Sequence, residues 1–236
     1  MSSNIHTNHS DSEKTKPVIG GIYDFGNLVW KVLDMQDNRA LLITEDIVEK
    51  RTYHTEYTDI TWKDCELRAY LNGIGKHTGE GFIERFSQLE KEKIVPVTNS
   101  NKDNQWYGAK GGEDTKDMIF LLSLEEVVRY FGDSGQLENK PYSFLIDDQY
   151  NNNRQAKFIN SDSWGWWWLR SPGLGKHDVA RVNIHGHVSV SGVYVCGGTV
   201  GTNNGVFFNG CYHQKTFAGV RPALWLNALA QEVIRT

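Results

Sequence analysis

Apolar and polar residues alternate with a period of two between residues 182 and 191, and this pattern constrains the fold more than any other. The apolar side chains occupy the even positions, namely Val182, Ile184, Val188 and Val190. Successive side chains of a β-strand point to opposite faces of a sheet, so the pattern predicts a half-buried hairpin with its polar face outward. We expect the turn around residues 185–187. After Gly192 the apolar phase shifts to odd positions, as a turn or a bulge requires.

Other short apolar runs, separated by turn residues, indicate further strands. An antiparallel meander is predicted for residues 22–25, 28–33 and 40–44. A buried strand is predicted for residues 117–122, an aromatic strand for residues 164–173, and a final strand for residues 219–226. The polar, Gly-rich residues 99–115 predict a long surface loop.

Three segments have helical character. Apolar residues fall near helical spacing in residues 61–75 and 81–92. Ser123 and Glu126 form a capping-box pattern that begins a third helix, and Gly132 supplies its end. Strands that do not alternate regularly with helices predict an α+β fold, with antiparallel sheets, two or three helices and long loops.

Composition excludes several classes of protein. The chain has 236 residues and a formal net charge of −4, which argues against nucleic acid or an anionic membrane as a partner. No apolar run approaches the length of a membrane-spanning helix. Residues 1–17 are polar, so we expect a flexible tail without a signal peptide, followed by a single domain over residues 18–236. Three cysteines are too few for a disulfide scaffold, which favours a reducing compartment or a virion or cell surface.

One group of metal-binding side chain types lies in the C-terminal region, and its members are His185, His187, Cys196, Cys211 and His213. The His-x-His and Cys-x-His spacings put both members of each pair on one face of a strand, as in zinc or copper sites. A metal-dependent enzyme on these residues is therefore an alternative to a scattered set of surface residues. Asp147 and Asp148 precede three asparagines, but their spacing matches no EF-hand loop, so a solvated turn is expected.

Two further sets of residues favour structural roles. A tryptophan-rich strand is more often packed in a core than used to stack sugars or bases, and this favours packing for Trp164 and for residues 166–168. Arg221 lies within an apolar strand. A buried arginine needs partners, so a structural ion pair is expected there rather than catalysis.

The segment between residues 182 and 220 has Lys215 as its one formal charge and is rich in Gly, Asn, Ser, Thr, Tyr, Phe and His. Aromatic residues supply rigid contact area and small polar residues supply adaptable hydrogen bonds, so this composition fits recognition loops as well as ordinary connecting loops. The predicted ligand-binding residues are polar or aromatic residues at outward hairpin positions or loop tips: Arg181, His187, Ser189, Tyr194, Asn203, Asn204, Phe208, Asn209, Tyr212 and His213.

Sequence motifs add a resemblance to a known family. The specific ones are W-W-L-R-S-P-G at residues 167–173, A-x-V-N-x-x-G-x-V at residues 180–188 and G-V-R-P-A-L at residues 219–224. Supporting motifs are W-K-V-L at residues 30–33, Trp62 with L-R at 67–68 and L-N at 71–72, and D-x-I-F-L-L-S at 117–123 with Glu126. Together they resemble an uncharacterised bacterial and phage domain family over about residues 18–228. That family is similar to proteins with the C-type lectin fold, in the branch shared with formylglycine-generating enzymes.

Some members of that family resemble the variable proteins of diversity-generating retroelements, in which template adenines are randomised. The resemblance implies a non-enzymatic binding protein without a cofactor, with residues 178–213 as the variable surface and a protein or cell-surface molecule as the ligand. Adenine substitution in an Asn codon never yields Lys, Glu, Gln, Met or Trp, and residues 181–213 contain none of these. An oxidase similar to the formylglycine-generating enzymes is the alternative, although those enzymes use closely spaced cysteines and Cys196 and Cys211 are far apart in the sequence.

Overall fold

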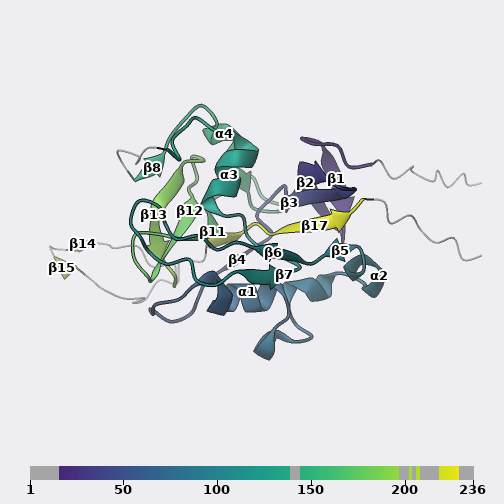
Figure 1. Cartoon of the computed structure of the whole chain (residues 1–236), viewed down its shortest axis with the longest axis horizontal. Coiled ribbons are helices and arrows are strands. Elements are labelled where there is room, and N and C mark those ends of the chain that lie inside the picture. Colours follow the sequence, from purple (N-terminus) through teal and green to yellow (C-terminus); the bar gives the residue numbers. More distant parts are fainter. Residues whose placement is uncertain (1–15, 139–143, 197–201, 204–205, 208–217, 229–236) are drawn as a thin grey trace, which may run out of the picture.

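Two β-sheets form the centre of the computed structural model, which describes residues 16–138, 144–196, 202–203, 206–207 and 218–228. The first sheet has five strands in the order β1-β2-β3-β17-β5, all antiparallel. Its strands are β1 (Ile22–Phe25), β2 (Leu28–Gln36), β3 (Arg39–Thr44), β17 (Ala223–Asn227) and β5 (Ile94–Val95). Figure 1 shows it beside the second, six-stranded sheet.

The six-stranded sheet has the order β4-β16-β11-β12-β13-β8, and β11 runs parallel to β16 while the other neighbours are antiparallel. Its strands are β4 (Glu49–Arg51), β16 (Ala218–Val220), β11 (Trp167–Pro172), β12 (Asp178–Val182), β13 (Val188–Tyr194) and β8 (Leu145–Ile146). Three short pairs complete the strands: β6 (Val97–Asn99) with β7 (Thr115–Asp117), β9 (Ala156–Lys157) with β10 (Trp164–Gly165), and β14 (Thr202–Asn203) with β15 (Val206–Phe207).

The helices are short. They are α1 (Glu66–Leu71), α2 (Gln88–Lys91), α3 (Leu124–Phe131) and α4 (Asn151–Arg154), together with the 3-10 helices η1 (Trp62–Asp64), η2 (Gly75–His77) and η3 (Phe82–Arg85). In Figure 1, α3 and α4 lie above β11, and α1 lies below β4. Few helices beside mostly antiparallel sheets confirm the α+β class. Within the described part of the chain, no helix is long and apolar enough to cross a membrane.

The predicted meander over residues 22–44 is confirmed as β1, β2 and β3. Gly26 and Asn27 make the first turn, and Asp37 and Asn38 make the second, all with positive φ. Gly, Asn and Asp are the residues that adopt this left-handed conformation most readily, which suits a tight hairpin. Local turn chemistry therefore sets the register of this edge of the sheet.

The predicted capping-box helix is confirmed as α3. Ser123 Oγ accepts a hydrogen bond from the Glu126 backbone nitrogen at 3.1 Å, and the Glu126 carboxylate accepts one from the Ser123 nitrogen at 2.8 Å. A third bond comes from outside the helix, because Ser171 Oγ accepts from the Leu124 nitrogen at 2.9 Å. The helix ends at Gly132, which has a φ of 131°.

The prediction of one helix over residues 81–92 is wrong. The segment divides into η3 and α2, with an extended residue, Phe86, between them. Ser87 then begins α2, because its side chain and that of Glu90 form their own capping box. Leu89, expected on an apolar face, is 71% exposed on the resulting short helix.

The prediction of a strand over residues 117–122 is correct about burial but wrong about pairing. Residues 119–122 are fully buried, yet β7 ends at Asp117. Side chains and single bridges satisfy the backbone: Asn72 Oδ1 accepts from the nitrogens of Met118 and Ile119, and Phe120 bridges Ala223. The segment is thus a core element without a continuous ladder of strand hydrogen bonds.

The predicted final strand, residues 219–226, is two strands in different sheets. Strand β16 belongs to the six-stranded sheet and β17 to the five-stranded sheet, with Arg221 and Pro222 between them. Arg221 Nε donates to the Thr44 carbonyl at 2.8 Å and Nη2 donates to the Glu45 carbonyl at 3.0 Å. The expected ion pair of Arg221 is therefore corrected, since backbone carbonyls and the Trp167 ring, 5.1 Å away, are its partners.

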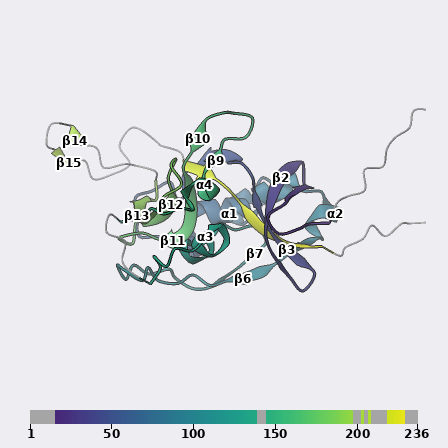
Figure 2. The same cartoon turned by 90° about the horizontal axis from the view of Figure 1, so that it is seen from above.

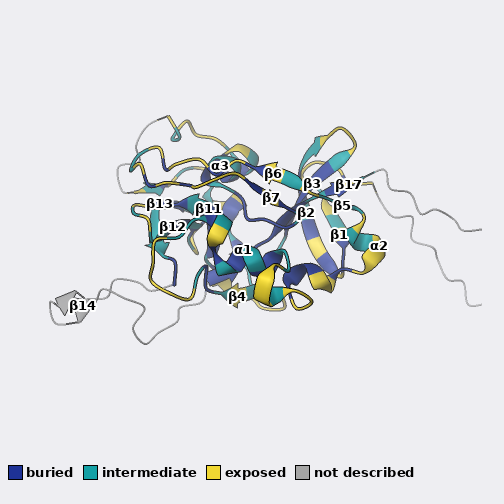
Figure 3. Ribbon diagram, turned by 60° about the horizontal axis from the view of Figure 1, so that its bottom comes forward, coloured by how far each residue is buried: buried dark blue, intermediate teal, exposed yellow. Residues whose placement is uncertain are grey.

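The core is one cluster of buried side chains that spans both sheets. Trp30, Trp62, Trp167 and Trp168 are each no more than 1% exposed. Figure 3 shows buried residues along β3, β17 and β11 and exposed residues at the turns. Packing is confirmed as the role of Trp167 and Trp168, whereas Trp164 is 49% exposed and Trp166 is half-buried.

Candidate functional site

The β12–β13 hairpin positions most of the predicted ligand-binding residues that the structure describes. Figure 2 shows β12 between β11 and β13. Asn183 shapes the turn, because its Oδ1 accepts hydrogen bonds from the nitrogens of His185 and His187 at 2.9 and 3.1 Å. Gly186 has a φ of 81°, and a Cβ atom there would lie 1.9 Å from the Asn151 carbonyl oxygen. The predicted hairpin and its turn are confirmed.

The predicted phase change near Gly192 is also confirmed. Gly192 has a φ of 74°, and the pairing register of β12 and β13 shifts between Val179 and Arg181. The predicted outward polar face is wrong at Ser189, which is 5% exposed. Strand β13 lies between β12 and β8, and Ser189 Oγ accepts a hydrogen bond from the Gly192 nitrogen at 3.2 Å. Ser189 therefore supports the bulge rather than a surface contact.

An aromatic cluster lies at the far end of β13 from this turn. The rings of Tyr57, His177 and Tyr194 have centroid separations of 4.5 Å (Tyr57 to His177), 4.9 Å (Tyr57 to Tyr194) and 5.5 Å (His177 to Tyr194). Tyr57 is 37% exposed. Asp59 adds charge at the edge, with its carboxylate 3.3 Å from Lys176 Nζ and 3.9 Å from His177 Nδ1. Of these residues, the sequence had singled out Tyr194.

Backbone hydrogen bonds bring Tyr57 to this place. The nitrogens of Tyr53 and His54 both donate to the Val195 carbonyl, and the Ile60 nitrogen donates to the Lys176 carbonyl. Burial and the adjacent Tyr194 hydroxyl raise the pKa of Tyr57 to about 12, so its phenol is a neutral hydrogen-bonding group at physiological pH. Tyr57 is far from residues 178–213 in the sequence and lies in a polar stretch, so no local pattern marks it.

Arg181 forms the second described part of the candidate surface. Its guanidinium lies over the ring of Trp166, 4.7 Å from the centroid. Trp166 in turn makes an edge contact with the buried Trp168, with centroids 4.9 Å apart. Burial lowers the pKa of the Arg181 side chain, since a charged group loses solvation there.

His187 is half-buried, and its Nε2 lies 3.4 Å from Asp147 Oδ1. The ring of His185 is 5.8 Å from that of His187. Cys196 lies beyond the opposite end of β13, so the strand's seven residues separate it from His187 by about 20 Å. Cys196 is also buried and disulfide-bonded. Among the residues with described side chains, no three His, Cys, Asp or Glu side chains are grouped to hold a metal ion.

The remaining predicted site residues lie outside the described residues or have no described side chain. Asn204, Phe208, Asn209, Cys211, Tyr212 and His213 belong to the first group. Asn203 is in β14, which pairs with β15, but its side chain is not described. Most of the predicted tail, residues 1–15, is likewise outside the described residues.

The Asp147–Asp148 turn uses its carboxylates internally. The Asp148 side chain is 4% exposed and forms an ion pair with the fully buried Arg154. It also accepts hydrogen bonds from Ser134 Oγ at 2.6 Å and from the Tyr150 nitrogen at 2.9 Å. The predicted solvated turn is therefore wrong for Asp148, although Asp147 is 61% exposed.

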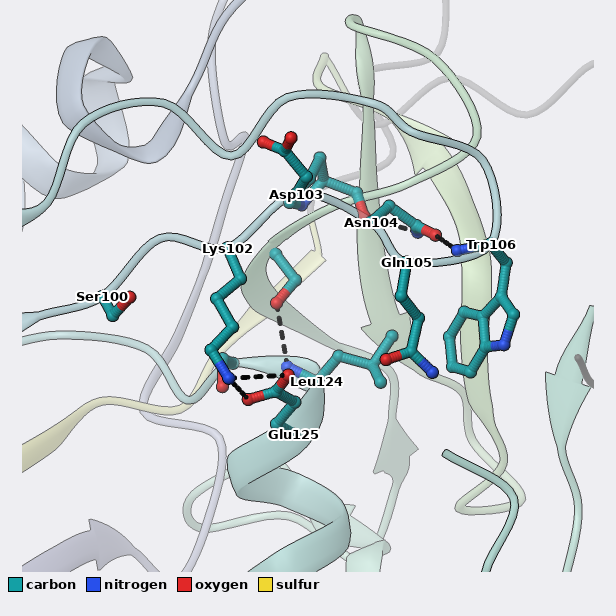
Figure 4. Close-up of a pocket in the computed structure, with 11 residues that line it drawn as sticks. Ser100, Lys102, Asp103, Asn104, Gln105, Trp106, Leu124 and Glu125 are labelled. Atoms are coloured by element: carbon teal, nitrogen blue, oxygen red, sulfur yellow. Dashed lines mark hydrogen bonds and ion pairs between the residues drawn. The ribbon is translucent and has the colours of Figure 1, made fainter. Parts of the chain in front are cut away.

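A pocket missed by the sequence analysis lies between the 99–115 loop and the start of α3 (Figure 4). Lys102 and Glu125 form an ion pair at its edge, with 2.8 Å between Nζ and Oε2, and Trp106 lines another part. The cavity volume is about 40 Å³, room for a few water molecules rather than a large ligand. The loop itself is anchored, because the buried Asn104 donates to the carbonyls of Pro172 and Val190.

The motif residues outside the hairpin form a buried polar framework. Asp117, whose side chain is fully buried, accepts hydrogen bonds from four side chains: Trp62 Nε1, Arg68 Nε, Asn99 Nδ2 and Thr115 Oγ1. Asn72 bonds the backbone of residues 118 and 119. Arg170 pairs with Glu126 at the start of α3. Each of these groups has hydrogen-bond partners within the protein, which is how a protein interior accommodates polar and charged side chains.

An α+β fold with a polar-aromatic surface on one sheet defines the class of this protein. The chain belongs to the family described as Domain of unknown function (DUF6273), whose model matches residues 37–228. No curated protein matches the chain. No solved structure matches it either.

Proposed function

We propose that this protein is a non-enzymatic recognition protein with a C-type-lectin-like fold, similar to the variable proteins of diversity-generating retroelements. Its ligand is a protein or another surface molecule of a host or neighbouring cell. The observation that carries the proposal is a difference in environment between the motif residues and the surface residues of the described structure. The charged motif residues Asp117 and Arg170 are buried and paired with Arg68 and Glu126, while the β12–β13 region presents aromatic and cationic groups at the surface.

The buried framework supports a scaffold role for the motifs. Asp117 and Glu126 each have an arginine partner, and Arg221 is bonded to backbone carbonyls. A carboxylate or guanidinium that is bonded to a distant part of the chain holds the two segments together. Substitutions elsewhere on the surface would then leave the fold unchanged, which is the requirement for a diversified binding protein.

The surface chemistry supports recognition. Tyr57 and Tyr194 present large rings whose hydroxyl groups donate and accept hydrogen bonds, and His177 adds a further polar ring. Tyrosine supplies contact area at a low cost in conformational entropy, and Tyr and Arg are enriched at the centres of interfaces. Tyr194 and Arg181 both fall within residues 178–213, where the resemblance predicts variation.

Sequencing the 3′ end of the gene across a natural population of its carrier tests the diversification. We expect amino-acid changes confined to adenine-derived codons between residues 178 and 213. Residues 164–172 and 219–226, which form β10, β11, β16 and β17, should be invariant. An even spread of substitutions over the gene would overturn the retroelement hypothesis.

A binding assay tests recognition directly. The full chain, immobilised on beads, is challenged with a panel of intact bacterial strains, and retention of cells is counted. We expect Tyr57→Ala and Tyr194→Ala to reduce retention of any strain that binds the unaltered chain. Leu89→Ala, at an exposed apolar residue on α2, is the matched control and should bind normally. Unchanged retention by both tyrosine variants would contradict a binding role for the aromatic cluster.

A further inference from the structure

The Arg181 guanidinium makes no hydrogen bond and no ion pair with any residue in the described part of the structure. Its Nε atom is buried and without a partner. In the described structure its guanidinium makes a cation–π contact with Trp166, whose ring centroid lies 4.7 Å from the guanidinium carbon. An arginine has five N–H donors in a rigid plane. Within the described structure, all five are uncommitted at Arg181.

Every other arginine that the structure describes has an oxygen partner. Arg39, Arg51, Arg68, Arg85, Arg129, Arg154 and Arg170 face carboxylates, and Arg221 bonds to carbonyls. The contrast is sharpest with Arg154 and Arg170, because both are buried and both are paired. Burial of an arginine without an acceptor is therefore unusual within this molecule.

Nearby residues do not supply the missing acceptor. The sequence contains no Asp or Glu from residue 179 to residue 231. Asp178 is in the same strand, but within the described structure its carboxylate forms no hydrogen bond or ion pair with Arg181 and instead accepts from the Gly175 nitrogen at 3.0 Å. Burial lowers the pKa of Arg181 with no acidic neighbour to oppose the effect. The guanidinium is therefore already partly desolvated before a ligand binds, and this favours a higher affinity for an anion.

We infer that Arg181 and Trp166 form a subsite for a carboxylate group on the ligand, such as an aspartate or glutamate side chain of a protein partner. The inference rests on the proposed recognition function and names the chemistry of one of its contacts. A planar guanidinium binds a planar carboxylate through two parallel hydrogen bonds, and the Trp166 ring fixes the plane.

A carboxylate suits this site better than a phosphate. Arg181 offers one positive charge, and the ring of Trp166 adds an apolar surface without a second cation. A phosphate near neutral pH carries more charge and has more oxygen atoms to satisfy, so its sites use further donors. A single carboxylate would satisfy the plane of donors at Arg181 without leaving excess negative charge.

NMR titration of the ¹⁵N-labelled full chain tests this subsite without a known partner. Sodium acetate and inorganic phosphate are the probes, each added at constant ionic strength. We follow the side-chain Nε–H signal of Arg181 and the indole N–H signal of Trp166. Acetate should shift both signals with the same saturation curve and a midpoint on the order of tens of millimolar, the weak affinity of one charge-assisted contact. The exposed Arg129 is the internal reference and should not saturate.

Two variants sharpen the result. Arg181→Gln should abolish the saturable response at Trp166, and Arg181→Lys, which keeps the charge but not the planar fork, should weaken it several-fold. Arg181→Lys keeps a cation over the Trp166 ring and should leave the urea midpoint of unfolding unchanged, whereas Arg181→Gln loses the contact with that ring and should lower the midpoint only slightly. A lowered midpoint for Arg181→Lys, which keeps the charge, would show a structural role for the guanidinium and overturn the proposal.

The remaining outcomes are equally decisive. Tighter binding of phosphate than of acetate would overturn the carboxylate assignment. A shift of the Arg181 signal that does not saturate and equals the shift at Arg129 would also overturn it. Acetate saturation at Arg181 supports the subsite even if population sequencing rejects diversification. Conversely, loss of cell binding in the tyrosine variants combined with no acetate response would retain the recognition function and remove this subsite.

Discussion

Arg170 donates to Glu126 through both ends of its guanidinium, with 2.8 Å between Nη2 and Oε1. This pair joins β11 to the first turn of α3. The same carboxylate accepts a hydrogen bond from the Ser123 nitrogen, and Arg170 Nη1 also donates to the Leu121 carbonyl. The arginine of the W-W-L-R-S-P-G motif therefore connects the N-terminal cap of α3 to the buried segment at residues 119–122.

Glu126→Gln should lower the free energy of unfolding by about 3 kcal/mol at pH 7, because it leaves the Arg170 charge buried without its carboxylate. Burial raises the pKa of Glu126, but Arg170 and the Ser123 hydrogen bonds outweigh it, and the net pKa is lowered. The contribution is therefore present above the ordinary glutamate pKa of about 4.3 and is lost as the pH falls through the lower folded value. Urea unfolding at several pH values measures both effects. A difference between the two proteins that persists at the lowest pH would contradict this assignment.

Asp117→Asn should also destabilise the protein by about 3 kcal/mol, since an amide cannot accept from four donors and leaves the Arg68 charge without its carboxylate. Glu113→Gln is the matched control, because Glu113 pairs with Lys63 at the exposed surface. The control should change stability by less than about 1 kcal/mol. Similar losses for the two variants in thermal or urea unfolding would refute the buried-framework interpretation.

Gly186→Ala should be much more destabilising than Gly135→Ala. Both glycines have positive φ, 81° and 77°, so both variants carry the backbone strain of about 1 kcal/mol for a left-handed alanine. At Gly186 the new Cβ would also lie 1.9 Å from the Asn151 carbonyl, whereas nothing lies within 4 Å at Gly135. Urea midpoints give the comparison, and equal losses would show that the hairpin turn can shift freely.

The Tyr57 phenol should titrate at a pH near 12, and Tyr194→Phe should lower that value, because burial and the Tyr194 hydroxyl both raise the pKa of Tyr57. NMR of the tyrosine ring carbons measures it, with Tyr130, whose pKa is raised mainly by its own burial, as the unaffected reference. The unfolded chain loses this proton near pH 10, so the contribution of Tyr57 to stability falls as the pH rises from there towards 12. An unchanged titration midpoint of Tyr57 in Tyr194→Phe would contradict the effect of the Tyr194 hydroxyl on Tyr57.

Local signals in the sequence predicted the elements that local interactions build. The capping box of Ser123 and Glu126 and the glycine and asparagine turns of the meander depend on neighbours within a few residues, and each was confirmed. The period-two pattern predicted the β12–β13 hairpin for the same reason. It failed at Ser189, which is buried and whose hydroxyl accepts a hydrogen bond from the Gly192 nitrogen.

Predictions failed where distant residues decide the structure. Residues 119–122 are as apolar as a strand, but their backbone partners are Asn72, Ala223 and Arg170. The final apolar run changes sheet at Arg221 because Thr44 and Glu45, far away in the sequence, offer carbonyls there. Hydrophobicity measures burial, and it does not specify which backbone group is the partner.

The candidate site shows the same limit. The sequence by itself determined the α+β class, the hairpin and the position of Tyr194 and Arg181 on it, because periodicity and turn chemistry are local properties. Tertiary structure alone decided that Tyr57 and His177 pack on Tyr194, and that Arg181 lies over Trp166 without a carboxylate. Contacts between segments far apart in the chain depend on how the sheet is assembled, and no pattern within either segment encodes them.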